Sequence, residues 1–208
     1  MSARPTIDVS RPTIDVSRLP TYAFGHRALT WWATWSMILM EGTMLGILLV
    51  SYFFLRTAVP DWPPGRTLPP NLFWGTLNSI IIALSLIPNH LTKRASESLN
   101  LKGVRLWIIV TALFGLAFLI VRIFEFKNLN CRWDENAYGS IVWFNMGFHT
   151  AHVLTDFIDT VVLMVLMFVG PIEGKRFVDV SENAIYWDFV VVIWLMIYFV
   201  IYIAPRVL

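Results

Sequence analysis

The sequence predicts an all-α protein, an integral membrane bundle of five transmembrane helices. Its composition is 57% hydrophobic and 14% charged, and its mean hydropathy of +0.63 is typical of membrane proteins. Several apolar stretches also reach the ~20 residues that a ~30 Å hydrocarbon core requires. The net charge of +2 is too small to indicate a nucleic-acid partner.

The spans are expected near residues 33–55, 72–91, 104–124, 139–169 and 186–204. Prolines between residues 60 and 70 mark the connection after the first span, and Pro171 and Gly174 mark the one after the fourth. The fourth stretch, at ~1.5 Å per residue, would be ~46 Å long. It must therefore tilt or extend beyond the bilayer.

The N-terminal segment, residues 1–27, is polar and contains the sequence RPTIDVS twice, at 4–10 and 11–17. Too few apolar residues are present to build a core, so we expect a disordered tail preceding a transmembrane domain at 28–208. The alternative is that the repeat docks on a partner subunit.

Lys and Arg are distributed unevenly between the two sides of the predicted bundle. On the N-terminal side are Arg4, Arg11, Arg18, Arg27, Lys93, Arg94, Lys102, Arg105, Lys175 and Arg176. On the other side are Arg56, Arg66, Arg122, Lys127, Arg132 and Arg206. The positive-inside rule then predicts a cytoplasmic N-terminus and a periplasmic C-terminus in a bacterial inner membrane.

A polar stripe crosses the fourth span. At 100° per residue, its members fall within an arc of roughly 80° on one helix; they are Asn145, His149, His152, Asp156 and Asp159. Ionisable groups in a bilayer are costly and normally face a bundle interior, which is where we expect this stripe. Hydrogen bonding between helices is the favoured interpretation, with a zinc or iron site as the weaker alternative.

Glu41 is the second candidate site. It lies about eight residues into the first predicted span, ~12 Å below the membrane surface by helical rise. A carboxyl group at that depth is expected to be neutral or hydrogen-bonded, because an unpaired charge is expensive there. Both a proton-exchanging role and a polar contact between helices fit this position.

The chain lacks the residues of a redox centre. Only His149 and His152 lie at membrane depth, and Cys131 is the single cysteine. Two histidines three residues apart do not ligate two haems and a copper. We therefore expect no cofactor in this chain and no catalysis by it alone.

Several segments resemble the subunit III family of the haem-copper oxidases. The segment SENAIYWDFVVVIWL is similar to the family pattern E-x-x-x-x-Y-W-H-F-V-D-x-V-W-L, and YGSIVWFNMGFHTAHV is similar to Y-G-S-x-F-F-x-x-x-G-F-H-G-x-H-V. Glu125 in RIFEF, Asn78 in TLNSIIIALSLI and Glu41 also match family positions. Asp188 stands where the family has His, and Asp156 and Asp159 have no counterpart in the patterns.

The resemblance implies a respiratory subunit that packs beside catalytic subunit I, with subunit II and possible supercomplex partners nearby, while haem and copper stay in subunit I. It implies bound phospholipid and support of proton uptake during oxygen reduction, with Glu41 as the buried carboxyl. The resemblance also implies that several residues contact other helices of the bundle or lipid; these are His149, His152, Glu125, Asn78, Tyr186 and Trp187. Longer members have two further helices, which another subunit would supply here.

Three alternatives stay open at this point. The chain could serve a nitric oxide reductase or a quinol oxidase, since the sequence distinguishes neither oxygen from nitric oxide nor cytochrome c from quinol. An independent proton or metal transporter is more remote, because no inverted repeat or broken-helix pattern is visible.

Overall fold

The computed structural model describes residues 22–65 and 67–207, and within that part of the chain all regular structure is helical. The elements are η1 (Gly25–Arg27), α1 (Leu29–Thr57), α2 (Leu72–Glu97), α3 (Leu101–Lys127), α4 (Ala137–Val169), α5 (Gly174–Tyr198), the π-helical turn η2 (Phe199–Ile203) and α6 (Ala204–Val207). The last three form one continuous rod of 34 residues. Five helices are long and apolar enough to cross a membrane, which confirms the predicted fold class.

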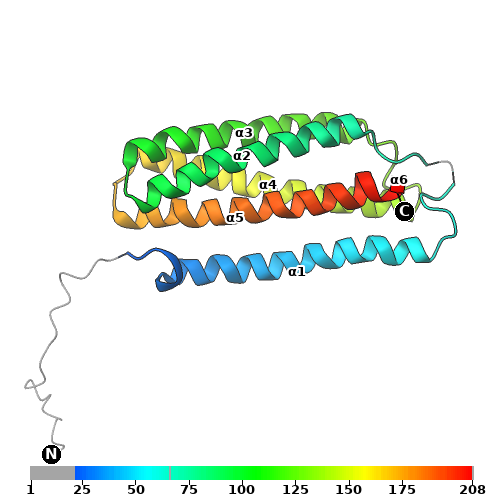
Figure 1. The fold of residues 1–208 in the computed structure, drawn as a ribbon, viewed down its shortest axis with the longest axis horizontal. Coiled ribbons are helices and arrows are strands. Elements are labelled where there is room, and N and C mark those ends of the chain that lie inside the picture. The colour runs from blue at the N-terminus through cyan, green and yellow to red at the C-terminus, as the bar shows by residue number, and fades with distance from the viewer. Residues whose placement is uncertain (1–21, 66, 208) are drawn as a thin grey trace, which may run out of the picture.

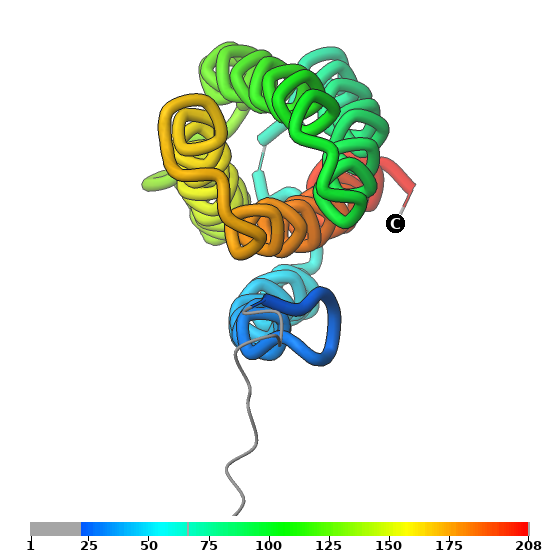
Figure 2. Tube along the Cα trace, turned by 90° about the vertical axis from the view of Figure 1, so that its left-hand side faces the viewer, coloured from blue at the N-terminus to red at the C-terminus, as the bar shows by residue number. Residues whose placement is uncertain are grey.

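Four helices form a ring and the fifth lies outside it. α2 packs against α3 and α5, and α4 packs against α3 and α5; viewed end-on, these four surround the bundle axis (Figure 2). α1 packs mainly against α4 and α5 and runs along the side of the bundle (Figure 1). Separate pockets lie along this contact between α1 and the ring, and we call this side of the ring the groove.

Three of the long helices begin with an asparagine cap. Asn71, Asn100 and Asn136 precede α2, α3 and α4, and each side chain accepts a backbone N–H two or three residues further on. Each cap satisfies an amide that has no partner inside its helix. The helices thus start at defined residues near the membrane surfaces.

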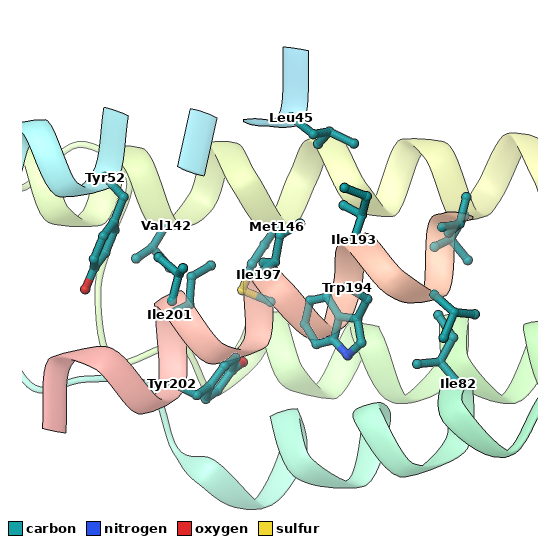
Figure 3. Packing of buried hydrophobic residues seen from close by; sticks show 14 of the residues in the cluster. Leu45, Tyr52, Ile82, Val142, Met146, Ile193, Trp194, Ile197, Ile201 and Tyr202 are labelled. Carbon is teal, nitrogen blue, oxygen red and sulfur yellow. The ribbon is translucent and has the colours of Figure 1, made fainter. Parts of the chain in front are cut away.

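The main core lies where α5 meets α4 and α2. Met146 from α4, Ile82 from α2 and Trp194 from α5 are fully buried, and Figure 3 shows them converging. On α1, Leu45 and Tyr52 are the buried residues, and Leu45 points from α1 toward the ring (Figure 3). Most of the α1 surface is therefore available to lipid or to a partner.

The fifth helix begins earlier than the sequence predicted. α5 starts at Gly174, twelve residues before the expected boundary at 186. The added segment contains Lys175, Arg176, Asp179 and Glu182, which lower the local hydropathy although the backbone is helical. The predicted disordered tail falls mainly on residues 1–21, outside the described residues, and remains a prediction.

Candidate functional site

Glu41 lies near the middle of α1 and faces the ring. Its side chain is 18% exposed, and it follows the start of α1 at Leu29 by twelve residues, or ~18 Å of helical rise. The expected ~12 Å was counted from residue 33, four residues after the observed start of α1. Glu41 therefore lies near the midpoint of this 29-residue helix.

Two side chains from two other helices meet Glu41 there. The Tyr186 hydroxyl on α5 donates a hydrogen bond of 2.5 Å to Glu41 Oε2. His152 Nε2 on α4 lies 3.7 Å from the same oxygen. The sequence pointed to each of these residues separately, and the fold brings them together.

The geometry of His152 requires a hydrogen between its ring and Glu41. His152 Nδ1 lies 2.7 Å from the carbonyl oxygen of Phe148, and a carbonyl only accepts, so Nδ1 carries hydrogen. In a neutral ring, Nε2 then faces Glu41 Oε2 with its lone pair. Two acceptors facing each other repel, so this contact needs a hydrogen between Nε2 and Oε2, supplied by either group or by a bridging water. The distance of 3.7 Å fits an ion pair or a water-bridged contact, and it is too long for a direct hydrogen bond.

His149 and Asn145 are separate from this site. His149 Nε2 lies 3.1 Å from the carbonyl oxygen of Val190 on α5, and its ring packs beside Trp194. Asn145 donates to the carbonyl of Ile141 within α4. Both side chains are fully buried; His149 joins α4 to α5, whereas the Asn145 hydrogen bond stays within α4.

The polar stripe faces the ring interior only in part. Asn145, His149 and Asp156 are buried, as predicted. His152 faces Glu41 on α1, between helices of the bundle, and Asp159 is exposed in the groove, so the expectation of an interior position fails for Asp159. The reason is that α1 lies outside the ring, so that one edge of the stripe borders the groove.

A second polar cluster lies inside the ring at the other end of the bundle. Arg122 Nη1 lies 3.0 Å from Glu125 Oε2 one turn away on α3. Glu125 also accepts hydrogen bonds from Asn78 Nδ2, at 2.8 Å, and from the Tyr202 hydroxyl. The guanidinium carbon of Arg122 lies 3.8 Å from the ring centroid of Trp194, which adds a cation–π contact.

Arg122 was assigned to a membrane surface by the charge count, and that assignment is wrong. Its side chain is 2% exposed, and it neutralises Glu125 inside the bundle. The signal that could have found this pair is an Arg and a Glu three residues apart within an apolar helix. Asn78 and Glu125 are thus interhelix contacts, consistent with the sequence-based expectation.

Trp187 is a core residue. It is 1% exposed, its Nε1 donates to Ser85 Oγ on α2 at 2.8 Å, and its ring packs closely over Gly115 on α3. It thereby ties α5 to two neighbouring helices of the ring.

Two features bear on cofactors and redox chemistry. Over residues 22–65 and 67–207, no group of three or more His, Cys, Asp or Glu side chains is arranged to hold a metal ion.

Cys131, in the connection between α3 and α4, is 3% exposed, and burial raises the pKa of its thiol to about 11. A thiol with that pKa is a poor nucleophile at neutral pH.

The fold and this site together define an integral membrane subunit with a carboxyl, a tyrosine and a histidine clustered in the bilayer. Comparison with known proteins makes the class more specific. Residues 35–205 match the family model for cytochrome c oxidase subunit III. The chain belongs to the cytochrome c oxidase subunit III family, as the sequence resemblance predicted.

Individual relatives agree with this membership. The chain is 29% identical over 175 residues to cytochrome c oxidase subunit 3 of Thermostichus vulcanus, which covers 81% of this chain and 84% of the relative. It is 30% identical over 159 residues to a probable cytochrome c oxidase subunit 3 of Mycobacterium tuberculosis, covering 74% and 78%. It is also 27% identical over 180 residues to a haem-copper oxidase subunit I+III of Aeropyrum pernix, covering 80% of this chain and 22% of the relative.

Proposed function

We propose that this chain is the accessory subunit III of a respiratory haem-copper oxidase, where it packs on the catalytic subunit I and holds an exchangeable proton at Glu41. The redox chemistry then takes place at haem and copper in subunit I. This chain supports proton exchange during oxygen reduction and increases the number of turnovers that the oxidase completes before it is inactivated. The relative named subunit I+III carries both parts in one polypeptide, which supports direct contact between them.

The observation that carries the proton role is the contact of Tyr186 and His152 with one oxygen of Glu41. A carboxyl group at the centre of a membrane helix is expensive unless its charge is removed or paired. Here the tyrosine donates to it, and His152 Nε2 lies 3.7 Å from the same oxygen, at a distance that fits an ion pair or a water-bridged contact. This arrangement can hold a proton on Glu41 near the middle of the membrane. The proton stays exchangeable because Glu41 lies outside the ring and its side chain is partly exposed.

Bound phospholipid is the second part of the proposal. A cavity of about 410 Å³ between α1 and α5 has mostly apolar walls, with Lys93 and Asp188 as its charged residues; its apolar lining is Trp31, Trp35, Ile38, Ile185, Phe189 and Val192. Apolar walls suit an acyl chain, and an ammonium group at the membrane surface suits a phosphate. A lipid here would lie in the groove between α1 and the ring.

The direct test is gentle purification of the tagged chain in mild detergent, followed by an optical spectrum and identification of co-purifying subunits. We expect haem bands together with an oxygen-consuming subunit I, and the donor subunit found beside it would distinguish cytochrome c from quinol. A colourless chain without partners, or one that co-purifies with a nitric oxide reductase, would contradict the proposal.

The proposed orientation has the N-terminus in the cytoplasm and the C-terminus in the periplasm, based on the charge bias. Native Cys131 is a poor reporter, because its thiol stays protonated up to the raised pKa of about 11. We expect it to resist a maleimide at neutral pH and to react after denaturation.

A Glu135→Cys change in a Cys131→Ala background places a thiol at an exposed position of the same connection. A membrane-impermeant maleimide should label this variant from the periplasmic side of intact cells. Labelling only after the cells are opened would contradict the proposed orientation.

A further inference from the structure

An acidic cavity opens between α1, α4 and α5 at the end of the bundle where α1 begins. Its volume is about 370 Å³, and its lining includes Asp156 and Asp159 from α4 and Asp179 and Glu182 from α5. Its other polar lining residues are Thr30 and Thr34 from α1 and Asn183 and Tyr186 from α5. The lining contains no Lys or Arg among the described residues. A cavity of this size has room for several water molecules.

Two of these carboxyl groups are buried and have at least one oxygen without a hydrogen-bond partner among the described residues. Asp156 is 1% exposed, and neither of its oxygens has a partner among the described residues. Glu182 is 6% exposed, and its Oε2 has none either. A buried carboxyl oxygen without a hydrogen-bond partner is unfavourable. Both groups face the cavity, where protons and water can satisfy these oxygens.

The carboxyl groups form a series from the membrane surface toward Glu41. Asp179 follows the start of α5 by five residues and Glu182 by eight, which are depths of ~8 Å and ~12 Å by helical rise. Tyr186 lies one turn deeper, lines the cavity and donates to Glu41. Asp156 lies one turn along α4 from His152. The deep end of the cavity thus adjoins the Glu41 site.

Charged groups on the neighbouring helices complete the surroundings. Arg176 lies 3.6 Å from Asp179 at the rim. Lys93 and Glu97 on α2 interact with Glu182, and Asp159 and Glu41 interact with Asp156. Basic groups are therefore confined to the surface end, while the deep end is acidic. No three of the described carboxyl groups are arranged to hold a metal ion.

We propose that this cavity is a water-filled proton well that connects the N-terminal membrane surface to Glu41 through Asp156. Once the Glu41–His152 pair has released its proton to water, one proton passes from Asp156 to the pair, and cavity water returns one proton to Asp156, so the number of protons on the site is the same before and after each exchange. The proposal rests on the proton role of Glu41 proposed above. Asp156 and Asp159 carry this function although the family patterns lack them.

The test follows deuterium exchange of the Glu41 carboxyl in the intact oxidase by infrared spectroscopy. The band is assigned by its loss in Glu41→Gln. In Asp156→Asn we expect exchange to slow on the order of 100-fold, the lower end of what a positioned proton-transfer group contributes. Asp61→Asn, at the opposite end of the bundle, should exchange like the unmodified protein.

A second variant keeps the test valid if Asp156→Asn does not assemble. Ala33→Phe would fill the cavity from an exposed position on α1 without removing a carboxyl group, and it should slow the exchange as well. Unchanged exchange in the assembled variants would overturn the well and leave the proton role of Glu41 intact. Absence of an exchangeable Glu41 band in the unmodified oxidase would overturn both.

Discussion

Replacing Arg122 by Met is expected to destabilise the protein by about 3–5 kcal/mol, because it leaves Glu125 buried without its counter-charge. Arg122 is 2% exposed, and its guanidinium lies between Glu125 and the ring of Trp194. Thermal unfolding of the purified complex in mild detergent, followed by circular dichroism, should show the midpoint for this subunit falling by roughly 10 °C.

The matched control removes both charges at once. In Arg122→Met combined with Glu125→Gln, Asn78 and Tyr202 still have a polar neighbour and no uncompensated charge remains. We expect this double variant to recover most of the lost stability, since a buried ion pair is often replaceable by neutral groups of similar size. A double variant less stable than Arg122→Met alone would show that the ion pair is not the source of the effect.

Trp187→Ala is expected to have the second large effect, with a loss of about 3–5 kcal/mol. The indole is 1% exposed and packs against Gly115 of α3, and its Nε1 bonds to Ser85 of α2. Its removal would leave a cavity where three helices meet. The amount of subunit retained in the purified complex after mild heating measures this loss.

Two comparisons separate packing from hydrogen bonding at this position. Trp187→Phe keeps most of the volume and should cost less, chiefly through the lost hydrogen bond to Ser85. Trp133→Ala changes a side chain that is 64% exposed and should leave stability close to that of the unmodified protein. Equal losses in Trp133→Ala and Trp187→Ala would contradict the core assignment of Trp187.

The helices were predictable because bilayer thickness imposes a length of apolar sequence that few soluble segments reach. The start of α5 was not predictable, because hydropathy measures only apolar content. Four charged residues lower the hydropathy of its first turns although the backbone there is a regular helix: Lys175, Arg176, Asp179 and Glu182. That error concealed the acidic segment that lines the cavity beside α1. A search for helix periodicity in addition to hydropathy could have extended the fifth helix toward Gly174.

The site could be predicted only as separate residues. Glu41 stood out as a carboxyl group in an apolar span, and His152 as part of a stripe, while Tyr186 came from the family resemblance. Helical periodicity orders side chains on one helix but does not say which helices meet. The contact between Glu41 and the other two depends on α1 packing in the groove of α4 and α5, which is a tertiary property.

The central claim is that Glu41 supports proton exchange during turnover. Its most direct test is Glu41→Gln in the complete oxidase, reconstituted into vesicles, with proton uptake and the number of turnovers before inactivation measured. We expect normal assembly, proton uptake slower by up to about tenfold, less than for a catalytic proton donor, and earlier inactivation. Asp61→Asn serves as the control. Proton uptake and working life equal to those of the unmodified oxidase would contradict the claim.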